Sequence, residues 1–207
     1  MNHLAHFLLA PADDASRMGT LLGDFARGTD LSHWPAAVER AIRLHRRVDA
    51  LTDGHPAVAA ARRGLPAAYR RYGGILLDVY FDHLLLHSWA RWHDQPLAAF
   101  AAATQAGLAR LAVRLPPRAA AVAAGLAAHQ GLLSCGTHAG MARVLARIGG
   151  RLSRPVALDA ALPALTAAHP ALEDAFHAFF PDLRAAAQAY LTASTLSTRP
   201  SALSVSR

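Results

Sequence analysis

The chain consists of apolar stretches at helical spacing, separated by short turns that contain proline, glycine or aspartate. This pattern predicts a series of amphipathic helices joined by short turns. The expected helices cover residues 2–10, 13–27, 35–52, a segment from 56 to the Gly73-Gly74 break, 75–92, a segment opened by Pro96, 117–131 and 138–149. Further prolines punctuate the C-terminal part, whose last long helix is expected to end near Ala193.

We expect a single domain over residues 1–193, because no internal repeat and no linker divides the chain. The Ser/Thr-rich end, residues 194–207, predicts a disordered tail. Alanine and leucine dominate, whereas the β-branched residues are sparse, and this balance favours helix over sheet. With 53% apolar and 17% charged residues, the composition is that of a globular protein. The fold class that follows is all-α, a single-domain helical bundle.

Net charge and cysteine content limit the possible partners and cellular compartment of the protein. The net charge of +7 favours an anionic partner, which could be a nucleic acid, a membrane surface, a phosphorylated ligand or an acidic protein. No dense arginine run with interleaved aromatic residues is present, so we expect no nucleic acid partner. The one cysteine excludes an internal disulfide and fits the cytoplasm. The N-terminus is a poor signal peptide, and without a long apolar run we expect no stable membrane association.

The segment DVYFDH, residues 78–83, places ionisable groups in an otherwise apolar helix. Asp78 and Asp82 are four residues apart and therefore share one face, while His83 lies about 100° further round the helix. Two carboxylates in a low dielectric repel each other unless a cation or an arginine lies beside them. One interpretation pairs the acids with Arg46, Arg47 or Arg70 and bonds His83 to a backbone carbonyl. The other interpretation is a bound metal ion.

Three further segments have the same character. They are HRRVD, in which His45 and Asp49 share a face beside Arg46 and Arg47; NHLAH, which contains His3 and His6; and LLGDFARG, which places Asp24 in the middle of an expected helix. Each polar group has a plain structural interpretation, as a satisfied core histidine or as the partner of an arginine. In the functional interpretation the histidine binds a metal and an arginine holds a phosphate oxygen.

Taken together, these segments place Asp or His on several helices, each within an apolar patch. Helices that bury such patches against one another would bring the polar groups together in the bundle interior. Mixed histidine and carboxylate ligands suit Mn²⁺, Fe²⁺, Mg²⁺ or Zn²⁺. The chain contains no paired-cysteine spacing, HExxH, P-loop or GxSxG motif. From the residues alone, a metal-dependent hydrolase and a non-catalytic helical module that binds an acidic protein are equally supported.

The motifs NHLAH, LLGDFARG, LHRRVDALTDGHP, LLDVYFDHLLLHSW, MARVLARI and FHAFFPDL follow one another in the order found in a known family. The chain resembles acyl carrier protein phosphodiesterase from Met1 to about residue 190, with the more specific motifs in the N-terminal half. That family is an atypical, all-helical branch of the HD phosphatase/phosphodiesterase superfamily. The resemblance implies an HD-like hydrolase that removes 4′-phosphopantetheine from a serine of holo-acyl carrier protein. It also implies a divalent metal, manganese before the other ions, and a role in lipid metabolism.

Residue by residue, the resemblance implies a metal site of His6, Asp24, Asp82 and His83. It implies that Asp78 is either a ligand or the group that orients one, and that His45 and Asp49 stand at or beside the site. The residues expected to take part in catalysis are Asp24, Asp78, His45, Arg46 and Arg47. Acyl carrier proteins are acidic, so the positive net charge would attract them.

The chain departs from the family pattern at three places. His3 stands where an apolar residue is usual, Ser88 stands where a histidine often precedes the tryptophan, and the segment 129–137 lacks an expected tryptophan. The last departure concerns carrier docking or substrate choice more than the metal chemistry. Two alternatives therefore stay open: an HD-type phosphohydrolase of a small nucleotide, and the non-catalytic module. The oligomeric state is not predicted.

Overall fold

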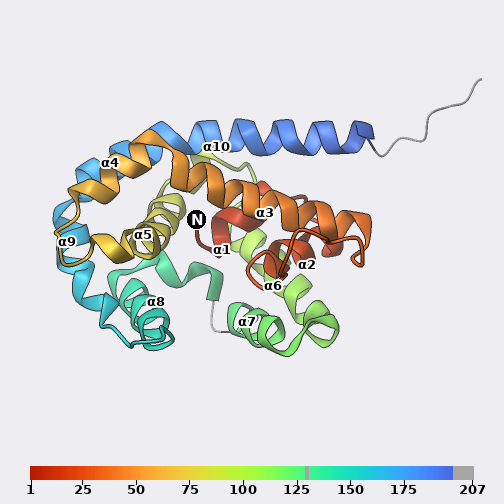
Figure 1. Ribbon diagram of the computed structural model, residues 1–207, viewed down its shortest axis with the longest axis horizontal. Coiled ribbons are helices and arrows are strands. Elements are labelled where there is room, and N and C mark those ends of the chain that lie inside the picture. The colour runs from red at the N-terminus through yellow and green to blue at the C-terminus, as the bar shows by residue number, and fades with distance from the viewer. Residues whose placement is uncertain (129–130, 198–207) are drawn as a thin grey trace, which may run out of the picture.

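The computed structural model of the chain describes residues 1–128 and 131–197, and this part is helical without any strand (Figure 1). The α-helices are α1 (His3–Leu9), α2 (Asp14–Leu22), α3 (Ala36–Gly54), α4 (Pro56–Gly64), α5 (Gly73–His87), α6 (Leu97–Leu111), α7 (Pro117–Ala127), α8 (His138–Gly150), α9 (Leu162–Ala167) and α10 (His169–Ser197). Short 3₁₀ helices are η1 (Arg70–Tyr72), η2 (Trp89–Arg91), η3 (Ala112–Arg114), η4 (Gly131–Gly136) and η5 (Leu158–Ala161). The predicted all-α fold class is confirmed.

The helices pack around α5, which is buried over most of its surface. α10 runs along one side of the molecule against α3 and α4, and α2 packs on α3 (Figure 1). The short helix α1 lies inside, between α2 and α5. Aromatic side chains of α5 and α10 pack together in the core, where Phe81 meets Phe176 and Phe179. This arrangement brings α1, α3 and α5, which carry the polar motifs, into one neighbourhood.

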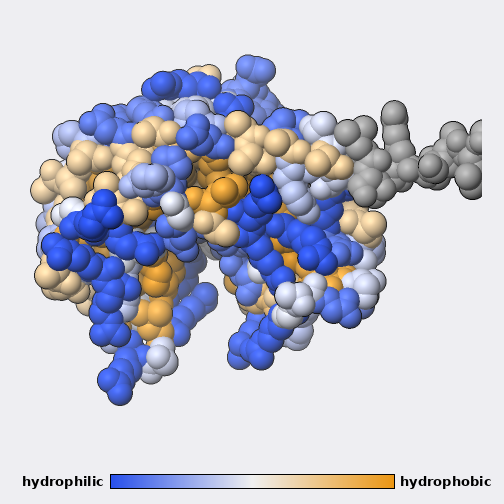
Figure 2. Space-filling view, turned by 45° about the horizontal axis from the view of Figure 1, so that its top comes forward, coloured by the Kyte–Doolittle hydropathy of each residue, from blue (hydrophilic) through white to orange (hydrophobic). Residues whose placement is uncertain are grey.

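α7 and α8 project on the side opposite α10 and flank a hollow (Figure 1). In the space-filling view the surface is notched between these two parts of the molecule, with apolar residues inside the notch and hydrophilic residues on its rims (Figure 2). No helix in the described part of the chain is both long and apolar enough to cross a membrane.

The second expected helix is shorter than predicted. α2 ends at Leu22, so Asp24 lies in the turn that follows and not within a helix. Two tertiary contacts explain the early end. The ring of His45 packs directly against Gly23, and Arg46 donates hydrogen bonds to the carbonyl oxygens of Ala26 and Gly28. Neither contact can be recognised from the local sequence, although Gly23 and Asp24 are themselves weak helix formers.

Other boundaries also differ from the prediction. α5 begins at Gly73 and ends at His87, where η2 follows, so the expected helix 75–92 is displaced towards the N-terminus. A side chain at Gly73 would collide with Arg62, which packs across the start of α5. α10 continues to Ser197, four residues beyond the predicted end of the helix. The rest of the predicted tail, 198–207, lies outside the described residues.

Candidate functional site

A histidine-carboxylate cluster forms where α1 meets α3. Asp49 Oδ1 lies 3.1 Å from His6 Nε2, and Asp49 Oδ2 lies 3.2 Å from His45 Nε2. His45 and Asp49 are one turn apart on α3, as their spacing predicts. The two imidazole rings stack in parallel, with centroids 3.8 Å apart and an interplanar angle of 6°. Each oxygen of a single carboxylate therefore holds one of two buried, parallel imidazoles.

Two more carboxylates border this cluster. Asp24 Oδ1, from the turn after α2, lies 3.3 Å from His45 Nε2. Asp78 Oδ1, from α5, lies 3.0 Å from the α-amino group of Met1, which is also 3.5 Å from Asp49 Oδ1. Both acids are partly exposed, whereas the two histidine side chains are buried. The cluster thus consists of two buried imidazoles bordered by the partly exposed carboxylates of Asp24 and Asp78, which we call the acidic rim.

The electrostatics of the two histidines differ sharply. Burial lowers the pKa of His6 to about 4, although its hydrogen bond with Asp49 opposes this shift. Burial also acts to lower the pKa of His45, but hydrogen bonds and charge from Asp24 and Asp49 outweigh it and raise the pKa to about 9. For Asp49, burial is outweighed by hydrogen bonds from both imidazoles, and its pKa falls below the usual range. A strong negative potential therefore acts at His45 Nε2.

The residues of this cluster fit a divalent metal ion. One ligand atom from each of His6, His45 and Asp49 lies within 4.8 Å of the other two. Both Nε2 atoms lie within hydrogen-bond distance of carboxylate oxygens, and His6 Nε2 is also 3.0 Å from the carbonyl oxygen of Met1, whereas neither Nδ1 atom has a hydrogen-bond partner. This arrangement favours a proton on each Nε2. A cation can replace those protons and satisfy the same negative potential, which is how metal binding is coupled to pKa in proteins. Imidazole nitrogen with carboxylate oxygen is a donor set that suits Mn²⁺, Fe²⁺ and Zn²⁺.

The predicted ligand Asp82 lies apart from the cluster. Its Oδ2 accepts a hydrogen bond of 3.2 Å from the backbone N–H of Leu4, at the first turn of α1. Its Oδ1 is buried without a hydrogen-bond partner, and burial raises the pKa of this carboxyl to about 7. Asp78 and Asp82 share a face, as predicted, and both meet donors near the N-terminus, Asp78 the amine of Met1 and Asp82 the backbone N–H of Leu4.

The predicted ligand His83 faces a different cavity. Its Nδ1 lies 2.8 Å from the carbonyl oxygen of Cys135 in η4, which matches the structural interpretation of this histidine. Burial lowers its pKa. The second cavity is also lined by four histidines that sequence reasoning did not group with His83: His87, His138, His169 and His177. The structure therefore brings together His6, Asp24, His45, Asp49 and Asp78, and it does not bring Asp82 or His83 into that cluster.

The arginines of the HRRVD segment have structural partners. Arg46 donates hydrogen bonds to the carbonyl oxygens of Gly28, at 2.8 Å, and Ala26, at 2.6 Å. Arg47 lies over the ring of Tyr190, 5.9 Å from its centroid. Within the described part of the chain, no ion pair joins either arginine to Asp78 or Asp82, and Arg70 bonds the carbonyl of Leu65 instead. The interpretation that pairs these acids with arginines is therefore wrong.

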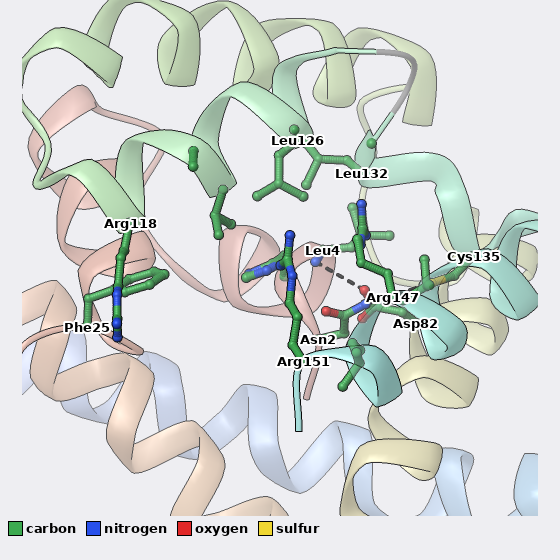
Figure 3. Close-up of a pocket in the computed structure, with 17 residues that line it drawn as sticks. Asn2, Leu4, Phe25, Asp82, Arg118, Leu126, Leu132, Cys135, Arg147 and Arg151 are labelled. Atoms are coloured by element: carbon green, nitrogen blue, oxygen red, sulfur yellow. Dashed lines mark hydrogen bonds between the residues drawn. The ribbon is translucent and has the colours of Figure 1, made fainter. Parts of the chain in front are cut away.

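A different set of arginines surrounds the cavity beside Asp82. Arg118 lies on α7, Arg147 on α8, and Arg151 directly after α8 (Figure 3). Sequence reasoning missed these residues, because neither their spacing along the chain nor their neighbours mark them as one group. They come together only through the packing of α7 and α8 around α1 and η4.

Comparison of the sequence with known proteins shows the family of this chain. The acyl carrier protein phosphodiesterase family matches residues 1–183. The chain belongs to the acyl carrier protein phosphodiesterase family. The acyl carrier protein phosphodiesterase of Salmonella dublin is 37% identical over 188 residues, which are 90% of this chain and 97% of that protein. The enzymes of Salmonella agona and Salmonella newport are 36% identical over the same lengths. No solved structure matches the chain.

Membership of the acyl carrier protein phosphodiesterase family confirms the resemblance expected from the motifs, and with it the prediction of a phosphodiester hydrolase. The match covers all five residues that the structure gathers around the cluster. Of the departing segment 129–137, residues 129–130 lie outside the described residues. The remainder contributes Gly131, Leu132 and Cys135 to the wall of the arginine-lined cavity. The departure therefore falls beside the cavity and not within the cluster.

Proposed function

We propose that this chain hydrolyses the phosphodiester bond between 4′-phosphopantetheine and a serine of holo-acyl carrier protein. The products are the apo-carrier protein and 4′-phosphopantetheine. Relatives that cover nearly the whole chain carry the corresponding name. The observation that carries the proposal for this chain is the buried cluster of His6, His45 and Asp49 with an accessible acidic rim. The net charge of +7 also suits an acidic protein substrate.

In this proposal a divalent metal, manganese in preference to Mg²⁺, Fe²⁺ or Zn²⁺, is held by His6, His45 and Asp49. When bound, it supplies Lewis-acid stabilisation of a phosphate oxygen and lowers the pKa of a coordinated water. The ligand set thus comes from two helices that pack together, α1 and α3. Asp82 and His83 stay predicted ligands, but the geometry favours the other three residues.

The carboxylates on the rim have distinct roles in the proposal. Hydrogen bonding and charge from His45 outweigh burial and keep the pKa of Asp24 below its usual value, so this side chain is ionised at neutral pH. It is about half exposed, at 47%, and its Oδ atoms can accept a proton from an attacking water. Asp49 holds both imidazoles in place through its two oxygens. Arg46 positions Asp24 indirectly, because it fixes the loop that follows this residue.

A holo-to-apo carrier assay tests the proposal. The purified chain is treated with EDTA, incubated with holo-acyl carrier protein with or without added Mn²⁺, and the carrier is weighed by mass spectrometry. We expect loss of the phosphopantetheine mass only when metal is added. A wild-type protein that leaves the carrier intact under all metal conditions, or that turns over a small nucleotide instead, would overturn the proposal.

The ligand set is tested separately. His45→Gln and Asp49→Asn should abolish Mn²⁺ binding in calorimetric titration and should abolish carrier hydrolysis. His33→Gln is the matched control, because His33 is an exposed histidine outside the cluster, and it should bind Mn²⁺ and turn over carrier as the wild type does. Unchanged Mn²⁺ affinity in His45→Gln would refute the assignment of these ligands while leaving the hydrolase activity itself standing.

A further inference from the structure

The cavity between α7 and α8 has the size and chemistry of a ligand site. Its volume is about 630 Å³, within the range of small-molecule sites in proteins. One part of the wall is apolar and consists of Val122, Leu126, Leu132, Val144 and Ile148. Asp82 lies at its inner side, and Arg118, Arg147 and Arg151 lie around it (Figure 3). We call this space the arginine cavity.

The arginine cavity adjoins the histidine-carboxylate cluster. His3 and Leu4, which line the cavity, precede the cluster residue His6 on α1, and the lining residue Phe25 directly follows Asp24. Burial lowers the pKa of His3, and the charges of both Asp24 and Arg147 act on it in opposite senses. The arginine cavity and the cluster therefore share α1 and the turn after α2 as a common boundary.

Asp82 provides a buried acceptor without a partner at the inner side of the cavity. Its side chain is 2% exposed, and only Oδ2 is satisfied, by the backbone of α1. A buried oxygen without a hydrogen bond destabilises the fold, so such a group calls for a donor from outside it. An amide N–H or a hydroxyl group of a ligand supplies that donor.

The arginines of the cavity are free to bind anions. In the described ranges, no ion pair or side-chain hydrogen bond engages the guanidinium groups of Arg118, Arg147 or Arg151. By contrast, Arg17 and Arg110 both pair with Asp14. Three unpaired guanidiniums around one cavity create a positive potential that attracts phosphate or carboxylate groups.

We propose that the arginine cavity receives the pantetheine arm of the carrier protein during hydrolysis. This inference rests on the proposed function and assigns the residues that recognise the substrate. The arm has amide and hydroxyl donors for Asp82 Oδ1, and methyl and methylene groups for the apolar wall. The arginines contact the phosphate and the acidic surface of the carrier at the cavity mouth.

A blocking substitution with a matched control tests the occupant. Ala121 lines the cavity from α7 and is exposed, whereas Ala124, three residues later on α7, is also exposed but does not line it. Ala121→Phe should therefore fill the cavity, and Ala124→Phe should not. By calorimetry, we expect Ala121→Phe to weaken binding of free 4′-phosphopantetheine at least about tenfold, because the ring occupies the ligand's volume, and to raise KM for holo-carrier similarly. Ala124→Phe should match the wild type in both measurements.

A charge substitution tests the arginines in the same way. Arg143 and Arg147 are one turn apart on α8 and both exposed, but only Arg147 lines the cavity. Arg147→Ala should weaken binding of free 4′-phosphopantetheine and raise KM, and Arg143→Ala, which changes the net charge equally, should do neither. Equal effects of the two substitutions would show that only the overall charge matters, and would overturn the assignment of Arg147.

Two further probes separate the possible results. If inorganic phosphate binds as tightly as 4′-phosphopantetheine, the cavity recognises only the anion, and the proposal that it receives the pantetheine arm is overturned. Wild-type hydrolysis with unchanged binding and KM in Ala121→Phe would refute the cavity while the proposed function stands. If the wild type does not hydrolyse the carrier, the proposed function fails first, and binding of free 4′-phosphopantetheine still decides whether the cavity accepts it.

Discussion

Gly23 makes the space in which the His45 ring lies. A Cβ atom at this position would meet His45 Cγ at 2.2 Å, Cδ2 at 2.5 Å and Nδ1 at 2.6 Å. The opposite movement is restricted, because the ring of His6 stacks against His45 with a centroid distance of 3.8 Å. Gly23→Ala is therefore a small substitution that should displace a proposed metal ligand directly.

The structure fixes both the sign and the size of the effect. Gly23 has helical dihedral angles, φ −50 and ψ −39, so alanine would by itself stabilise the fold by about 0.4–1 kcal/mol. Ordinary van der Waals contact with the ring begins at 3.4 Å, so the ring or the turn has to move by roughly 1 Å. Overpacking of this kind costs about 1–3 kcal/mol, so we expect net destabilisation. A displacement of that size at a reactive centre lowers turnover by about 10²-fold.

Denaturant unfolding and the carrier assay measure the two effects. Gly54→Ala serves as the control, because Gly54 ends α3 and a Cβ there meets nothing within 4 Å. This variant should be unchanged or slightly more stable, with full activity. In a His45→Ala background, Gly23→Ala should lose its cost in stability, because the colliding ring is absent. A Gly23→Ala protein that is stabilised and fully active would refute the proposed role of the His45 position.

Three other predictions follow from contacts at and around the site. With EDTA present, protonated His45 should contribute its full share to the free energy of unfolding below pH 6.5, and this contribution should be lost as the pH rises through about 9. Urea unfolding between pH 6 and 10 measures this dependence, and Asp49→Asn should make the free energy of unfolding depend less on pH. Arg46→Ala should lower the free energy of unfolding by about 1–3 kcal/mol, because two carbonyl groups lose a charged donor, whereas Arg47→Ala should change it by less than about 0.5 kcal/mol. Burial raises the pKa of the Cys135 thiol, so the native protein should react slowly with a thiol reagent and the urea-unfolded protein rapidly; equal rates would contradict this placement.

The fold was largely predictable because its helices have local punctuation. Pro35, Pro56, Pro96 and Pro117 each stand at or directly before the start of an α-helix. The boundaries that sequence reasoning missed depend on partners distant in the chain. The segment after Leu22 begins with Gly23 and Asp24, which are weak helix formers, and contacts from His45 and Arg46 of α3 hold it in a turn.

The candidate site was predictable in part. The spacing of His45 and Asp49 placed them correctly on one face of a helix, and the apolar surroundings of His6 indicated its burial. Asp24 does lie beside His45, but it is about half exposed and not buried as its apolar neighbours indicated. The sequence could not indicate that Asp49 is the central residue of the cluster. Its two oxygens bridge both imidazoles, a role that depends on how α1 lies against α3. The arginine cavity could not be predicted from the sequence either, because its lining residues come from helices that share no sequence pattern.

Asp82 and His83 show that neighbours in a motif can lie in different surroundings. Successive residues on an α-helix differ by about 100°, and α5 is buried on most sides, so each neighbour faces a different element. Asp82 meets the start of α1, whereas His83 meets η4. Asp78, one turn earlier than Asp82, reaches the amine of Met1 beside Asp49. On a buried central helix, consecutive polar residues therefore face different neighbouring elements. Residues that together could bind one metal ion come instead from different helices that contact each other.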